Sequence, residues 1–272
     1  MSGERASGEL RGRTILVTGA GSGIGYAYAE VSARNGADLV LIDRDADGVE
    51  AKAAELRAHG TEVTTFTADI SDPEQVDAVF DEIAERFEVD GAFLNAGVNG
   101  TVSSRLPDGH IDVTSREIWH RVMGINLDGF FYTLQRTAGM MKPRRRGTIV
   151  VTGSTAGLRV EPLVGYAYVA SKHAVHAVSR QAALELSQFG IRVNVIAPGS
   201  FRTNIAGPGP APADKVEMWN RGIPLGRHGQ TDELQEMALL LISETRSTFM
   251  TGGVYVVDGG ASVLTQITTD LL

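Results

Sequence analysis

Short runs of apolar and β-branched residues alternate along the chain with longer segments whose apolar residues fall at helical spacing. We expect strands at residues 14–17, 38–43, 62–68, 91–94, 148–152, 191–196 and 253–257. We expect helices at residues 26–35, 47–59, 73–87, 115–137, 167–188 and 231–243. Strands that are apolar on both faces and alternate with helices are typical of a parallel sheet covered on both sides. The pattern therefore predicts an α/β fold: one doubly wound domain with a parallel sheet of about seven strands.

The length of the chain, 272 residues, suits one large domain. We expect an N-terminal tail at 1–12, a folded domain at 13–262 and a C-terminal tail at 263–272. The first residues alternate charged and small side chains, and the longest apolar run, Met237 to Ile242, is far shorter than the ~18 residues of a membrane span. We therefore expect no signal peptide, no membrane anchor and a cytoplasmic location.

Charge and cysteine content narrow the chemistry. The formal net charge is −8, so we expect no nucleic-acid partner and no membrane partner. The chain has no cysteine, which excludes disulfides, thiolate metal sites and cysteine nucleophiles. We expect no metal site either, because His173 and His176, three residues apart on one predicted helix, have no visible third ligand. Packing or exposure explains these two histidines better.

A glycine-rich loop joins the first predicted strand to the first predicted helix. Gly19, Ser22, Gly23, Ile24 and Gly25 belong to it. Backbone N–H groups at such a helix start suit a phosphate or pyrophosphate, and the glycines would permit positive φ and close approach of a ligand. The loop departs from the G-x-G-x-x-G spacing, because Ile24 takes the third glycine position, and no Lys-Ser/Thr pair of a Walker A loop follows.

Asp43 ends the second predicted strand, 18 residues after Gly25. A carboxylate at about this distance accepts a hydrogen bond from a ribose 2′-hydroxyl, although a loop cap is the simpler role. Because a carboxylate would repel a 2′-phosphate, Asp43 favours NAD over NADP. Arg44 argues the other way, since its guanidinium could neutralise a 2′-phosphate if it turned inward.

Tyr168 and Lys172 are four residues apart, which places them on one face of a predicted helix. A tyrosine has an ordinary pKa near 10, so its use as a base near neutrality needs a shift of roughly three units. A nearby ammonium stabilises the phenolate. Tyr166 competes for this role but lies six residues before Lys172, on the far side of the helix.

Two further polar residues stand near this pair in the predicted fold. Ser154 follows the strand at 148–152, at the sheet edge where doubly wound folds bind ligands. It could donate to a substrate oxygen beside Tyr168, or form a turn before Gly157. Asn126 falls inside an apolar helix where asparagine is unfavourable, so it needs partners such as a bent backbone or a water chain.

Taken together, these motifs resemble the classical short-chain dehydrogenase/reductase family over about residues 12 to 262, and the fold this implies is of Rossmann type. The loop from Thr18 to Gly25 resembles the family's cofactor loop. Asn126, Ser154, Tyr168 and Lys172 fall on its catalytic tetrad.

The resemblance extends to other cofactor contacts. Asp69 and Ile70 look like the acid and its neighbour that contact adenine. Asn95, Ala96 and Gly97 correspond to the motif that steadies the central sheet. Pro198 and Gly199, with Thr203 beyond them, resemble the segment that holds the nicotinamide carboxamide.

The resemblance implies a mechanism of proton and hydride transfer. Tyr168 would remove the hydroxyl proton, hydride would pass to the nicotinamide, and Ser154 would steady the developing oxyanion. Lys172 would lower the pKa of Tyr168 and bind the nicotinamide ribose. Asn126 would anchor a proton-relaying water.

Three departures from the family pattern stand out. Leu94 occupies a position that is commonly asparagine, which should cost one structural hydrogen bond. Thr152-Gly153-Ser154 replaces the usual Ser-Ser, so Ser154 alone fills the serine role. The segment from Val98 to Arg116 is longer than is common, which would put extra loop beside the substrate.

Three other segments have weaker signals. The basic run at 142–146 is better explained as a solvated loop than as a nucleic-acid patch. Residues 204–222 contain Pro, Gly and Trp219 and are expected to form a substrate lid. The tail at 263–272 resembles segments at subunit contacts, and the resemblance implies a homotetramer.

The sequence therefore predicts an NAD-dependent oxidoreductase that interconverts a secondary alcohol and its ketone. An NADPH-dependent ketoreductase of the 3-oxoacyl type and a non-catalytic dinucleotide sensor are the alternatives. The complete set of Asn126, Ser154, Tyr168 and Lys172 argues against the sensor.

Overall fold

A seven-stranded, entirely parallel sheet forms the centre of the protein, in a computed structural model that describes residues 8–161, 163–203 and 220–263. The strands are β1 (Thr14–Thr18), β2 (Asp38–Asp43), β3 (Val63–Thr67), β4 (Val89–Leu94), β5 (Gly147–Thr152), β6 (Ile191–Pro198) and β7 (Val254–Val257). Their order is β3-β2-β1-β4-β5-β6-β7. The order reverses between β1 and β4, which is where doubly wound folds open a ligand crevice.

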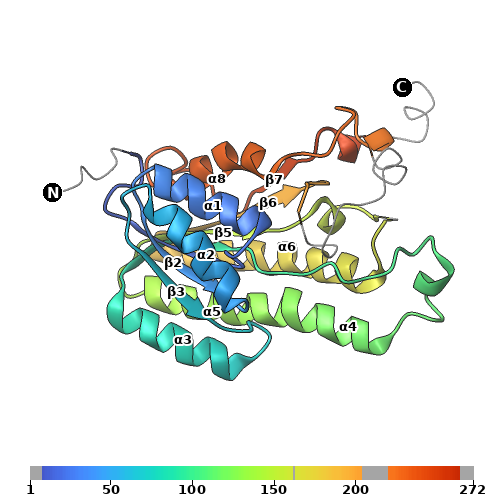
Figure 1. Cartoon of the computed structure of the whole chain (residues 1–272), viewed down its shortest axis with the longest axis horizontal. Coiled ribbons are helices and arrows are strands. Elements are labelled where there is room, and N and C mark those ends of the chain that lie inside the picture. Colours follow the sequence, from blue (N-terminus) through green and yellow to red (C-terminus); the bar gives the residue numbers. More distant parts are fainter. Residues whose placement is uncertain (1–7, 162, 204–219, 264–272) are drawn as a thin grey trace.

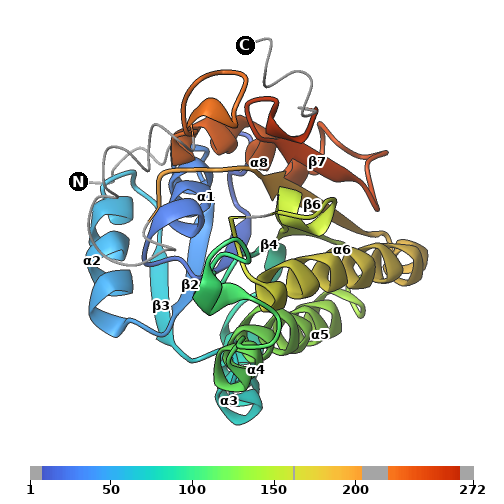
Figure 2. The same cartoon turned by 90° about the vertical axis from the view of Figure 1, so that its right-hand side faces the viewer.

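Helices cover both faces of this sheet (Figure 1). They are α1 (Gly23–Arg34), α2 (Ala46–Arg57), α3 (Pro73–Arg86), α4 (Arg116–Met123), α5 (Phe130–Met141), α6 (Tyr166–Leu186) and α8 (Gln235–Ile242). Figure 2 shows α1 and α2 grouped apart from α4, α5 and α6. Two apolar cores result. One contains Tyr28 of α1 and Leu56 of α2, and the other contains Phe80 of α3, Leu134 of α5 and Val175 of α6.

The predicted doubly wound α/β fold is confirmed, and the differences lie at element boundaries. α1 begins at Gly23, three residues before the expected start. The helix expected at 115–137 consists of α4, a π-helical turn at Gly124–Gly129 and α5, which continues to Met141. Hydrophobic spacing does not reveal such a turn, because it depends on what Asn126 contacts elsewhere in the chain.

Three of the four basic residues in the run at 142–146 pair with carboxylates. Lys142 Nζ lies 2.6 Å from a carboxylate oxygen of Glu185, and Arg144 lies 2.8 Å from Asp90. Arg146 pairs with Glu244. These contacts tie the loop before β5 to its neighbours, which agrees with the interpretation as a surface loop.

Some expected segments lie outside the described residues: most of the lid at 204–222, and all but the first residue of the tail at 263–272. Of the expected tail at 1–12, residues 8–12 are described, and Leu10 is buried there. In the part of the chain that is described, no helix combines the length and apolar character of a membrane span.

Candidate active site

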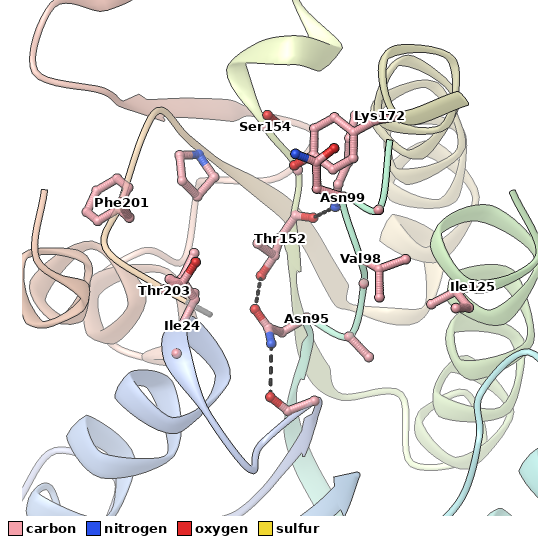
Figure 3. Close-up of a pocket in the computed structure, with 18 of the residues that line it drawn as sticks. Ile24, Asn95, Val98, Asn99, Ile125, Thr152, Ser154, Lys172, Phe201 and Thr203 are labelled. Atoms are coloured by element: carbon pink, nitrogen blue, oxygen red, sulfur yellow. Dashed lines mark hydrogen bonds between the residues drawn. The ribbon is translucent and has the colours of Figure 1, made fainter. Parts of the chain in front are cut away.

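A cavity of about 890 Å³ opens at the carboxyl ends of the strands, on the side where the strand order reverses. It is lined by nearly all residues that the sequence nominated: Gly19, Ser22, Gly23, Ile24, Asp43, Arg44, Asp69, Ile70, Asn95, Ala96, Gly97, Ser154, Tyr168, Lys172, Pro198, Gly199 and Thr203. Gly25 and Asn126 do not line it. Figure 3 shows Ile24 and Thr203 at one side of this cavity, and Ser154 and Lys172 at another.

Two glycines of the loop have the conformation that was expected. Gly19 and Gly23 have φ values of 67° and 55°, which disfavour side chains. Gly25 does not have a positive φ, so that expectation was wrong. Its role is close packing, because a Cβ on Gly25 would lie 2.0 Å from the carbonyl oxygen of Gly19.

The N-terminus of α1 is suited to an anion. Ser22 at its N-cap makes no side-chain capping bond, and its first turn contains no acidic residue. By contrast, α2, α3 and α4 are capped by the side chains of Asp45, Asp72 and Ser115. The first N–H groups of α1 therefore lack a side-chain acceptor beside the cavity, which fits the pyrophosphate of a dinucleotide.

Asp43 is held at the edge of the same loop. Its Oδ2 accepts a hydrogen bond of 2.8 Å from Gly21 N, and its Oδ1 accepts one of 3.1 Å from Asp45 N. The carboxylate is thus fixed where it lines the cavity, so the cap role and a ribose role are compatible. Arg44 also lines the cavity, and it is exposed.

Asn95 joins three strands below the cavity. Its Nδ2 donates to the carbonyl oxygens of Thr18 and Gly19, and its Oδ1 accepts a bond of 3.0 Å from Thr152 Oγ1 (Figure 3). Its backbone N–H donates to Thr18 Oγ1. The family position that is commonly asparagine is the buried Leu94, so Asn95 and the threonine side chains make the links between β1, β4 and β5.

The adenine and nicotinamide segments also reach the cavity. Asp69 Oδ1 accepts bonds from the backbone and side chain of Ser71, which fixes the chain after β3. Gly199 follows β6, and its N–H donates to the carbonyl of Val257. A Cβ on Gly23 would lie 3.4 Å from Thr203 Cγ2, so the segment after β6 lies close to the glycine loop.

Ser154, Tyr168 and Lys172 meet at the end of β5. Tyr168 and the side chain of Ser154 are close enough for Ser154 to lower the pKa of the tyrosine. Lys172 is 5% exposed, and its Nζ donates to the Thr152 carbonyl at 2.9 Å and lies 5.9 Å from the centre of the Tyr168 ring. Tyr166 is exposed on another side of the helix. Ser154 Oγ also accepts from Ala156 N, so the serine forms the turn and meets Tyr168 as well.

The pKa of Tyr168 departs from the expectation that Lys172 lowers it. Burial raises the pKa of Tyr168, the hydrogen bond with Ser154 lowers it, and the negative charge of Glu161 raises it further. Burial lowers the pKa of Lys172 to about 8. The expected lowering of the tyrosine pKa by Lys172 is therefore not seen in the protein alone, because burial is the largest influence on Tyr168.

Asn126 lies behind the cavity wall, 1% exposed, in the π-helical turn. Its Oδ1 accepts from Val98 N and its Nδ2 donates to Val98 O, both at 2.8 Å. The Nδ2 also donates to Ser171 Oγ at 3.2 Å. Both amide hydrogens are used, so the side chain fastens the backbone of Val98 to α6.

The substrate side of the cavity is lined partly by the long segment that begins at Val98. Asn99, Gly100 and Thr101 of this segment border the cavity. Glu161, the neighbour that raises the pKa of Tyr168, also borders it, 3.5 Å from Arg159. The segment that begins at Val98 and the residues just before α6, including Glu161, thus form walls of the cavity around Tyr168.

The sequence interpretation missed several supporting residues. Thr18 Oγ1 accepts from the backbone of Asn95, and Thr152 Oγ1 donates to its side chain. Ser171 Oγ accepts from the side chain of Asn126, and His176 accepts from the backbone of Ser154. Spacing offered one signal: His176 is four residues after Lys172 and therefore on the same face of α6.

Comparisons with known proteins identify the class. The family model described as "Enoyl-(Acyl carrier protein) reductase" matches residues 19–262. Levodione reductase of Leifsonia aquatica is 36% identical and covers 92% of this chain and 94% of its own, and cyclohexanol dehydrogenase of Acinetobacter sp. is 34% identical and covers 93% and 96%. The structure of a 3-oxoacyl-[acyl-carrier protein] reductase with bound NAD from Brucella melitensis has a TM-score of 0.82 and 31% identity, with 95% of this chain and 94% of that chain covered.

The chain belongs to the short-chain dehydrogenase/reductase family. It is an oxidoreductase of the class that uses a nicotinamide dinucleotide.

Proposed function

We propose that this protein is an NAD-dependent oxidoreductase that interconverts a secondary alcohol and its ketone, with Tyr168 as the acid and base. The convergence of Tyr168, Ser154 and Lys172 at the end of β5, beside the glycine loop, is the observation that carries the proposal. Of the two relatives named above, one is named as a reductase and the other as a dehydrogenase of cyclohexanol, a secondary alcohol, which supports a carbonyl–carbinol reaction.

The residues suit particular parts of the reaction. Gly19, Gly23 and the start of α1 would hold the pyrophosphate, and Asp43 a ribose of the cofactor. The nicotinamide ring, when bound, would accept hydride from the carbinol carbon and bring a positive charge to the site. Ser154 would donate to the substrate oxygen, and Tyr168 would take the hydroxyl proton in oxidation and return it in reduction.

The position of Lys172 fits a supporting electrostatic role. Its pKa of about 8 leaves the amino group largely protonated at neutral pH. The Thr152 carbonyl holds the group near the tyrosine ring. We infer that Lys172 stabilises the phenolate once the cofactor is bound, and that it binds the nicotinamide ribose.

The test is tyrosine-dependent reduction of NAD. The purified protein is incubated with NAD or NADP and one member each of four classes: cyclohexanol, a sugar alcohol, a hydroxysteroid and an aryl alcohol. Nicotinamide absorbance should rise with at least one alcohol, faster with NAD. A signal only with NADP would favour the ketoreductase alternative, and NAD binding without turnover on any carbinol or ketone would favour the sensor.

Tyr168→Phe is the matched variant, because it removes only the hydroxyl. Turnover should fall by about 10²–10⁴-fold, the usual contribution of a positioned acid–base group, while NAD binding stays nearly intact. Retained turnover would overturn the assignment of the base.

Assembly and location are also proposals. We expect a homotetramer, from the family resemblance, and a cytoplasmic protein, and light scattering of the purified chain would test the first. Dimers or monomers at micromolar concentration would contradict the tetramer.

A further inference from the structure

His176 lies behind the proposed catalytic residues and has no place in the mechanism above. It follows Tyr168 by eight residues and Lys172 by four, so the three side chains share one face of α6. His176 is 5% exposed. Its Nε2 lies 3.3 Å from the backbone nitrogen of Ser154, whose N–H donates to it.

Two glycines make room for the imidazole. A Cβ on Gly153 would lie 2.1 Å from His176 Nε2, far inside contact distance. A Cβ on Gly157 would lie 2.7 Å from His176 Cε1. The imidazole therefore occupies the space that a side chain at 153 would need, which explains why glycine stands before Ser154 where the family commonly has serine.

The charge state of His176 fits an acceptor. Burial, and then the positive charges of Lys172 and His173, lower the pKa of His176 to about 4, so the ring is neutral at neutral pH. Because Nε2 accepts from Ser154, the ring proton is on Nδ1, which is buried next to Gly157 and has no hydrogen-bond partner among the described residues. A neutral ring adds no second charge next to Lys172.

We propose that His176 is a positioning residue that holds the backbone of Ser154, so that the serine hydroxyl faces Tyr168, and that Gly153 is needed to admit the imidazole. This inference rests on the proposed function. Ser154 Oγ caps the short turn Thr155–Gly157, and the bond to His176 holds the backbone nitrogen of Ser154 at the residue just before this turn. An unsatisfied buried N–H is costly, so without an acceptor the turn would shift, and the serine with it.

The test compares two replacements of similar size. His176→Gln keeps a neutral acceptor, whereas His176→Leu fills the space without one. On the best alcohol found for the wild type, His176→Leu should lose about tenfold in kcat, with KM for NAD unchanged, and His176→Gln should recover most of it. His173→Leu is the control, because His173 is exposed on the same helix and its ring bonds the carbonyl of Val169 rather than the backbone of Ser154.

These outcomes separate positioning from folding. If His176 had a purely structural role, replacing it would lower the melting temperature and the fraction of protein that binds NAD. The kcat per NAD-binding site would then be unchanged in both variants. Equal kcat values for wild type, His176→Gln and His176→Leu would overturn the inference while the proposed function stands. Loss of turnover in Tyr168→Phe, measured in parallel, tests that function independently.

Nitrogen-15 spectra of the histidine side chains give a readout that needs no substrate. His176, assigned by its disappearance in His176→Gln, should show an unprotonated, hydrogen-bonded Nε2 and a protonated Nδ1 near pH 7. A proton on Nε2 would overturn the inference even if every alcohol tested were inert.

The fit between Gly153 and the imidazole is tested by a double-mutant cycle. Gly153→Ser alone should displace His176 and lower both kcat and the melting temperature. Gly153→Ser with His176→Val should recover part of both, because the smaller side chain returns the space, although Val195 also lies 2.6 Å from the added Cβ. Strictly additive effects would show that the two positions are independent.

Discussion

At the scale of the residue, the proton affinity of Tyr168 is set by competing neighbours. Burial and the carboxylate of Glu161 raise its pKa, and the hydrogen bond with Ser154 lowers it. Without the cofactor, the protein therefore disfavours the deprotonated form of Tyr168, which the reaction needs near neutral pH. Positive charge supplied by the bound cofactor and by Lys172 would correct this balance, so proton removal would be favoured only when the site is loaded.

The contribution of Glu161 can be isolated by Glu161→Gln. Removing the negative charge stabilises the phenolate, so the pKa of Tyr168 falls. Oxidation needs the deprotonated tyrosine, and its rate rises with pH through this pKa. The rising limb of the pH profile of kcat should therefore move to lower pH. The variant leaves the charge of Lys172 in place, and the positive charge of Arg159, no longer paired with Glu161, also lowers the pKa of Tyr168.

Initial rates of alcohol oxidation from pH 6 to 10 would measure this shift. Glu82→Gln is a suitable control, because Glu82 is exposed on α3 and pairs with Arg86. A limb that moves to higher pH, or does not move, would mean that Glu161 does not act on Tyr168 through its charge.

We propose that Asp43 sets the preference for NAD over NADP through similarly local contacts. Its carboxylate is fixed by Gly21 and Asp45 at the cavity wall, where it would accept from a ribose hydroxyl and repel a 2′-phosphate. Asp43→Ala should reduce the ratio of kcat/KM for NAD over NADP by about tenfold or more, the value of one charge-assisted hydrogen bond. Steady-state kinetics with both cofactors would measure it, and an unchanged ratio would remove Asp43 from cofactor discrimination.

At the scale of the element, the π-helical turn between α4 and α5 is the feature with the clearest consequence. It buries Asn126 and turns its amide onto both backbone groups of Val98, 28 residues away. A third bond reaches Ser171 on α6. One side chain thus joins the helix, the start of the long loop and the helix that contains Tyr168.

Asn126→Ala should therefore loosen the cavity wall as well as the fold. Leaving the half-buried backbone groups of Val98 unpaired costs about 1 kcal/mol or more, and the melting temperature should fall by a few degrees. The kcat should fall too, since Val98 borders the cavity. Thr133→Val is the control: its hydroxyl bonds only carbonyls of its own helical region, so its loss should spare kcat.

The elements also show what the sequence could predict. All seven strands were predicted within about two residues, because buried parallel strands are continuous apolar runs ended by turn residues. The helical spacing and the end of β5 also predicted that three side chains lie together, those of Ser154, Tyr168 and Lys172. The π-helical turn did not, because it depends on a contact between Asn126 and Val98 that no local pattern contains.

The same reason explains the other omissions. His176 contacts Ser154 only because α6 packs across the end of β5. The sequence shows Gly153 as a departure from the family pattern, but it does not show that an imidazole fills the space beside this glycine. The pKa of Tyr168 depends on how deeply the ring is buried, which spacing alone does not give. Gly25 was expected to permit a positive φ because it stands in a glycine loop, but it already belongs to α1, whose residues have helical φ values.

At the scale of the whole molecule, the cavity crosses the line where the strand order reverses. β1 and β2 contribute the glycine loop and Asp43 on one side, and β4, β5 and α6 contribute Asn95, Ser154 and Tyr168 on the other. A dinucleotide in this cavity would contact both halves of the sheet. Its binding energy would then add to the stability of the folded domain as a whole, because the unfolded chain has no such site.

Thermal unfolding with added cofactor follows from this arrangement. At 100 times its Kd, NAD should stabilise the fold by about 2.7 kcal/mol, which raises the melting temperature of a domain of this size by roughly 5 °C or more. NADP at the same concentration should raise it less, and Asp43→Ala should reduce the difference between the two. Tyr168→Phe should keep the full shift with NAD, because its hydroxyl serves proton transfer more than binding. A shift with NAD that vanishes in Tyr168→Phe would show that the tyrosine is chiefly a binding residue, whereas no shift with either cofactor would contradict the dinucleotide site itself.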